Sequence, residues 1–87
     1  MKTSEMFQQE IAKVPTDLRL ELDLSFSIAD KIDKILQRKG MTQKEFAKRM
    51  NKTEAEVSRW LSGTHNFTLK TLAKITSVLE EKIIVIP

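Results

Sequence analysis

The sequence lacks the residues on which most small proteins with disulfide bonds, metal sites or catalytic nucleophiles depend. Among its 87 residues there is no cysteine and only one histidine, His65. Without cysteine there can be no disulfide framework, thiolate zinc site or cysteine nucleophile, and a single histidine cannot supply a His pair for a metal. No nucleophile–base pair, carboxylate dyad or phosphate loop can be assembled either. We therefore expect a protein that is not an enzyme, with no cofactor, no metal and no small-molecule substrate.

Long apolar runs are also missing. The longest, Ile83-Ile84-Val85-Ile86, is far too short to cross a bilayer. The opening residues, MKTSEMFQQE, are too polar for a signal peptide. We expect a cytoplasmic protein with no membrane partner. A chain of this length forms one domain of modest stability, which favours self-association.

Charge is unevenly distributed along the chain. Residues 1–30 carry three basic and six acidic side chains, residues 31–52 carry eight basic and two acidic, and residues 53–87 carry four of each. A basic segment that follows an acidic one favours a polyanionic partner for the middle of the chain. Any one of these lysines, taken alone, is better explained by a solvated helix face.

Hydroxyl residues and glycines divide the middle of the chain into four helices. Four segments open with a residue that can cap a helix N-terminus: Ser27, Thr42, Thr53 and Thr68. Thr42–Glu45 and Thr53–Glu56 have the pattern of capping boxes. Two segments end at Gly40 and Gly63, where glycine tolerates a left-handed conformation.

Apolar residues recur at helical spacing in each of these segments. The four stripes are Ile28, Ile32, Ile35 and Leu36; Phe46, Ala47 and Met50; Val57, Trp60 and Leu61; and Leu69, Leu72, Ala73, Thr76 and Leu79. We expect them to form the core. Trp60 is expected in the core rather than as a platform for base stacking. Phe67 is expected to pack against the core and close it.

The two ends of the chain have different patterns. Phe7, Ile11 and Val14 suit a short helix ended by Pro15, and Lys82–Pro87 predicts a strand or an extended tail. Between Leu18 and Phe26 apolar and polar residues alternate, which is a strand signal. Leucine, arginine and glutamate are helix formers, however, and Pro15-Thr16-Asp17 resembles a helix start. We favour a helix and keep the strand as the alternative.

Two short helices with a tight connection are the most informative feature. Gln43–Met50 and Glu54–Ser62 are separated by three residues, the spacing of a helix-turn-helix. Asn51 suits a left-handed position in the turn, and Ala47 allows the two helices to approach closely. We therefore expect an all-α bundle with three parts: a helical arm over 1–26, a helix-turn-helix domain over 27–80 and a tail over 81–87.

The same region resembles a known family. MTQKEFAKRMNKTEAEVSRWLSG followed by THNFTLKTLAKI resembles the lambda repressor/Cro (XRE) family of helix-turn-helix regulators. The matching residues are Thr42-Gln43, Phe46-Ala47, Val57-Ser58-Arg59-Trp60, Gly63 and Leu69/Leu72/Ala73. The resemblance covers about Ile28 to Leu79. The small size, the N-terminal extension and the loop SGTHNFT further resemble antitoxins of bacterial toxin–antitoxin operons.

The resemblance implies that Glu54–Ser62 lies in the major groove of DNA. The core stripe then turns the other residues of this helix outward. Arg59 is the best candidate base reader because guanidinium can pair with guanine O6 and N7, with a phosphate contact as the alternative. For Glu54 the alternatives are cytosine N4 and a solvated acid favoured by the helix dipole. The predicted base-reading residues are Thr53, Glu54, Ala55, Ser58 and Arg59.

Phosphate contacts are expected around this helix. In the family the residue matching Gln43 holds both a phosphate and the recognition helix, and free N–H groups at a helix N-terminus favour an anion. For His65 and Asn66 the alternative is a turn with local hydrogen bonds. The predicted phosphate-binding residues are Thr42, Gln43, Lys44, Lys52, Ser62, Thr64, His65, Asn66 and Lys70.

Two departures from the family pattern shape the functional hypothesis. Glu54 and Glu56 bring negative charge to the start of the reading helix, which weakens DNA binding. The fifth helix that often forms the dimer is missing, so we expect the tail or the arm to replace it. The leading hypothesis is a homodimeric, nucleoid-associated repressor that binds double-stranded DNA at a palindromic operator. The alternatives are an antitoxin whose arm neutralises a toxin protein, which can coexist with DNA binding, and an interaction bundle without DNA binding.

Overall fold

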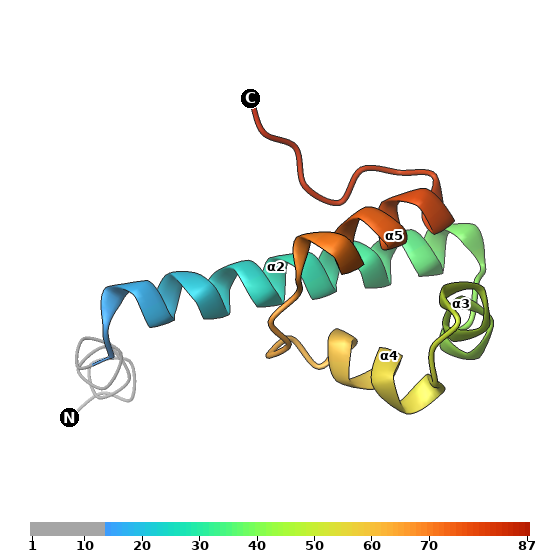
Figure 1. Cartoon of the computed structure of the whole chain (residues 1–87), viewed down its shortest axis with the longest axis horizontal. Helices are drawn as coiled ribbons and strands as arrows, with labels where there is room; N and C mark the ends of the chain where they lie inside the picture. Colours follow the sequence, from blue (N-terminus) through green and yellow to red (C-terminus); the bar gives the residue numbers. More distant parts are fainter. Residues whose placement is uncertain (1–13) are drawn as a thin grey trace.

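The computed structural model describes residues 14–87, and this part of the chain contains four helices and no strand. The helices are α2 (Thr16–Lys39), α3 (Gln43–Met50), α4 (Glu54–Leu61) and α5 (Leu69–Leu79). Figure 1 shows α2 as the long axis of the molecule, with α5 along its C-terminal half, α3 seen end-on and α4 at the opposite edge. The all-α helix-turn-helix bundle is confirmed. The helix expected around Phe7 and Ile11 lies outside the described residues.

Helix α2 is longer than predicted. It begins after Pro15 and ends at Gly40, whose φ is 66°, so its 24 residues join the second part of the expected arm, from Thr16 on, to the expected first helix of the domain. The predicted N-cap at Ser27 is wrong, because Ser27 lies in the middle of this helix. A serine caps a helix only where the preceding residues leave the helical conformation, and helix-forming residues precede this one. The helix favoured between Leu18 and Phe26 is confirmed.

The core forms where α2, α3, α4 and α5 meet. Its buried members are Ile32, Ile35, Leu36, Phe46, Ala47, Met50, Val57, Trp60, Leu72, Ile75, Leu79 and Ile83. Trp60 packs edge-on against Phe46, with ring centroids 6.4 Å apart. Ile28, Leu61 and Phe67 are partly buried against this cluster, so Phe67 closes one edge as expected.

The expected stripe on α5 is wrong at two positions. Leu69 is 83% exposed, Ala73 is also exposed, and Ile75 is fully buried. Leu72, Ile75 and Leu79 are spaced by three and four residues, so they share one helical face. Ala73 follows Leu72 by about 100° of rotation and turns away from that face. Leu69 lies in the first turn, where it is beyond the edge of the core.

The tail is extended, and the strand alternative is wrong. Glu80 adopts a left-handed conformation with a φ of 55°, after which the chain runs back over α5 (Figure 1). Ile83 enters the core, and Glu81 pairs with Arg38 at the end of α2. A strand needs a neighbouring strand, and residues 14–87 provide none. None of the four helices in this part of the chain combines the length and hydropathy of a membrane span.

Candidate nucleic-acid interface

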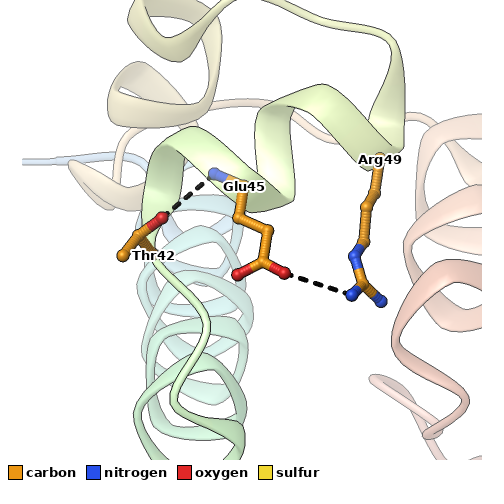
Figure 2. Close-up of polar contacts among 3 residues, drawn as sticks. All are labelled: Thr42, Glu45 and Arg49. Carbon is orange, nitrogen blue, oxygen red and sulfur yellow. Dashed lines mark hydrogen bonds and ion pairs between the residues drawn. The ribbon is translucent and has the colours of Figure 1, made fainter.

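The first turn of α3 is exposed and begins with a capped N-terminus. The Thr42 side chain caps the helix by accepting from the Glu45 backbone N–H over 3.1 Å. The predicted capping box is only half formed, because the Glu45 carboxylate accepts from Arg49, one turn later, instead of the Thr42 N–H (Figure 2). Gln43 and Lys44 are exposed in the first turn. The N-terminus of α3 can therefore receive an anion, with a lysine beside it.

A left-handed residue makes the turn between α3 and α4. Asn51 has a φ of 57° and a ψ of 44°, as its residue type predicts. The backbone N–H groups of Asn51 and Lys52 donate to carbonyl groups in the last turn of α3. Thr53 then caps α4 with a complete capping box, in which Glu56 accepts from the Thr53 N–H over 2.9 Å. Both ends of the turn are thus fixed by local hydrogen bonds.

One face of α4 is buried and the other is free. Val57 and Trp60 are buried in the core. All five residues predicted to read bases are exposed: Thr53, Glu54, Ala55, Ser58 and Arg59. Figure 1 shows α4 at the outer edge of the bundle. The helix can therefore enter a groove without moving the core.

The loop after α4 holds the remaining predicted phosphate contacts in different environments. Ser62 and Thr64 are exposed, and their hydroxyl oxygens are 3.3 Å apart. The Ser62 hydroxyl donates to the Arg59 carbonyl. The His65 ring is partly buried, with its centroid 4.8 Å from that of Phe67 and 6.0 Å from that of Trp60. His65 therefore contributes to the packing of this loop.

Asn66 connects the same loop to α2. Its amide donates to the Glu21 carboxylate over 3.2 Å, and both residues are exposed. This bond is not the local turn given as the alternative for Asn66, because Glu21 is distant in the sequence. Lys70 is exposed in the first turn of α5, and the loop connects this helix to α4 (Figure 1).

A hollow of about 300 Å³ joins the start of α3 to the end of α4. Gln43 and Ser62 both line it, together with Gly63. The structure thus brings two of the predicted phosphate contacts to one rim. Asp30 and Asp33 of α2 line the same hollow, although Asp30 pairs with Lys34 and Asp33 accepts from Gln37.

Charge around α4 is mixed. A hydrogen bond from the Thr53 N–H holds the pKa of Glu56 below its ordinary value, and the charge of Lys52 adds to this. Glu56 is therefore an ionised part of the cap, whereas Glu54 is exposed outside the capping box. Lys44, Lys52 and Arg59 supply exposed positive charge nearby. No group of three or more His, Asp or Glu side chains within residues 14–87 is placed to hold a metal.

One residue that supports this site was missed from the sequence. The Phe26 ring lies against the Cα of Gly63, directly after α4. Phe26 appeared only as the last member of an alternating stretch. Its spacing from Leu22 and Ala29 on α2 was an available helical signal, but nothing in the sequence pointed to the glycine as its contact.

Comparison with known proteins agrees with this geometry. A family model described as helix-turn-helix matches residues 32–85, which is more than half of the chain. No curated protein and no solved structure matches the chain. The matched residues include α3, the turn, α4 and α5, and therefore most of the surface described above. The chain belongs to the lambda repressor/Cro-like helix-turn-helix family of DNA-binding transcription regulators.

Proposed function

We propose that this regulator is a repressor that binds a palindromic operator as a homodimer and reads it with α4. The observation that carries the proposal is the outward face of α4, where Ala55, Ser58 and Arg59 are exposed while Val57 and Trp60 hold the helix in the core. Ala55 can contact a thymine methyl group, the Ser58 hydroxyl can hydrogen-bond to a base edge, and Arg59 can pair with guanine.

Phosphate contacts on both sides of α4 would set its register. Gln43 and Ser62 line the same hollow at the C-terminal end of α4. Lys52 lies just before the N-terminus of α4. Contacts of this kind position a protein on DNA without reading sequence. In a dimer the two α4 helices would lie about 34 Å apart, one turn of DNA.

Selection of bound DNA from random duplexes by the purified protein tests the proposal. We expect a palindromic sequence whose half-sites are one or more helical turns apart. Arg59→Ala should lower affinity for it by about 1–3 kcal/mol and relax the preference at one base pair. Lys74→Ala is the matched control, because Lys74 is an exposed cation on α5, a helix drawn at the opposite side of the bundle from α4 (Figure 1). Absence of duplex binding at about 50 mM salt, where phosphate contacts are strong, would favour an interaction bundle instead.

A second function, neutralisation of a toxin, is favoured by a groove between α2, the loop before α5 and α5 itself. The groove has a volume of about 440 Å³ and is lined by apolar side chains, including Leu24, Ile28 and Phe67, with Asp17 and Glu21 among its polar residues. Leu24 is 62% exposed. An apolar groove bordered by acids suits a basic partner protein.

Co-expression with the product of the neighbouring reading frame tests the second function. If that product arrests growth, the intact chain should restore growth, and Leu24→Asp should abolish the rescue while operator binding is retained. Leu69→Asp is the matched control on α5, since Leu69 is also exposed. Rescue that is equal for both variants would contradict an antitoxin role for this groove.

A further inference from the structure

We propose that the N-terminal half of α2 forms the dimer interface by pairing antiparallel with α2 of a second copy. The inference rests on the proposed function only in requiring a dimer. It assigns that dimer to a groove formed by residues Val14, Thr16, Arg19, Leu20, Leu22, Asp23 and Phe26. We call this groove the α2 groove. In Figure 1 this half of α2 extends beyond the other helices.

The α2 groove is apolar and open. It has a volume of about 630 Å³, and among its side chains Leu20 is 57% exposed and Phe26 is 52% exposed. A helix that displays large apolar side chains outside its own bundle usually buries them against a partner. Because protruding leucines and the space to receive them lie on the same helix, one patch can serve both copies, as a two-fold interface requires.

Two opposite charges on the α2 groove are self-complementary. Arg19 and Asp23 both line it, one helical turn apart. When two copies of α2 pair antiparallel about the level of residue 21, Arg19 of each copy lies level with Asp23 of the other. Two reciprocal ion pairs then form, and charge pairs of this kind fix the register of an interface. The apolar groups agree, since Leu20 of one copy lies level with Leu22 of the second.

Glu21, at the centre of this arrangement, does not cause repulsion between the two copies. Glu21 would meet Glu21 of the second copy if it pointed into the α2 groove. Instead it lines the adjoining groove beside α5, which shares only Leu20 with the α2 groove, and it accepts from Asn66 over 3.2 Å. The two like charges are therefore turned away from each other, and the groove keeps only its complementary pair.

Charge exchange in the full-length protein tests this interface without DNA. Sedimentation equilibrium should show a dimer for the parent chain. Arg19→Asp alone and Asp23→Arg alone should each weaken self-association by at least about tenfold, because like charges then face each other. The double variant Arg19→Asp/Asp23→Arg should restore the parent dimer, since the exchange recreates both pairs. Leu69→Asp should leave association unchanged, because Leu69 is exposed on α5 and lies outside the α2 groove.

Three results would overturn the inference. One is a double variant that remains as weak as the single variants while all of them melt like the parent by circular dichroism. Another is loss of the dimer on Val85→Asp but not on Arg19→Asp, which would assign the interface to the tail. The third is a monomer that dimerises only after residues 1–13 are deleted, which would give the α2 groove to the chain's own first residues.

The failure of this inference can be distinguished from failure of the proposed function. A protein that selects palindromic DNA and stays dimeric in every charge variant contradicts the α2 interface alone. A protein whose dimer responds to the charge exchange but which selects no duplex contradicts the repressor alone. The two readouts, sedimentation without DNA and selection with DNA, are independent.

Discussion

The aromatic ring of Phe26 lies against the Cα of Gly63, so that α2 supports the chain directly after α4. Gly63 is buried and has a φ of 96°. A Cβ built at this position would overlap the Cδ1 and Cε1 atoms of Phe26. Glycine is therefore favoured here twice: by the backbone conformation, and by the ring, which would have to shift to admit a Cβ.

Gly63→Ala is expected to lower the free energy of unfolding by about 2–5 kcal/mol, combining left-handed strain with overpacking. Gly40→Ala is the matched control, because Gly40 also has a positive φ but nothing lies within 4 Å of a built Cβ. It should cost only about 1–2 kcal/mol. The double variant Phe26→Ala/Gly63→Ala should lose less unfolding free energy than the sum of the losses in the two single variants. Urea unfolding of the parent, the three single variants Gly63→Ala, Gly40→Ala and Phe26→Ala, and the double variant measures these effects, and strict additivity would show that the ring is not the obstacle.

Asn51 is expected to tolerate glycine but not a branched residue. Its φ of 57° and ψ of 44° are left-handed, which glycine adopts freely and valine does not. Asn51→Gly should leave the melting temperature nearly unchanged, whereas Asn51→Val should cost about 1–2 kcal/mol and weaken operator binding, because the turn sets the angle of α4. Equal melting temperatures for the two variants would mean that the turn does not depend on this conformation.

The Glu56 cap is expected to make stability depend on pH. The pKa of Glu56 is lowered in the folded state, mainly by the hydrogen bond from the Thr53 N–H. A carboxylate of this kind stabilises the fold above its ordinary pKa of 4.5, and the effect is lost as the pH falls through the lower folded value. The advantage of the parent over Glu56→Gln should therefore be constant near neutral pH and shrink in acid.

Chemical unfolding at successively lower pH measures that advantage. Glu54→Gln is the matched control, because Glu54 is in the same turn but outside the capping box. An advantage over Glu56→Gln that stays unchanged in acid would contradict a contribution from the ionised cap.

Glu54 is expected to limit DNA affinity at low salt. It is exposed at the start of α4, where a phosphate backbone would approach. Glu54→Gln should increase affinity for all duplexes by removing repulsion, and the gain should diminish as salt rises. Filter-binding titrations over a salt series measure this. A loss of affinity confined to duplexes with one particular cytosine would show instead that the carboxylate accepts from cytosine N4.

The sequence by itself determined the local framework of the DNA-reading unit. Thr42, Thr53 and Thr68 cap helices as predicted, and Asn51 and Gly40 take the left-handed positions. These features depend on hydrogen bonds and backbone angles within about one helical turn. Their determinants are therefore adjacent in the chain, and the outward face of α4 followed from them.

Only the tertiary structure decided how that unit is supported. It made α2 one helix through Ser27, placed Ile75 rather than Ala73 in the core and brought Phe26 to Gly63. It also joined Asn66 to Glu21 across the loop. The contacts of Phe26 with Gly63 and of Asn66 with Glu21 depend on which surface of one element meets another, and residues distant in sequence carry no local signal of that choice. Helix-forming residues before Ser27 and the spacing of Ile75 were local signals, but they competed with other patterns that were equally local. Packing between elements thus selected among alternatives that helix propensity and periodicity left open.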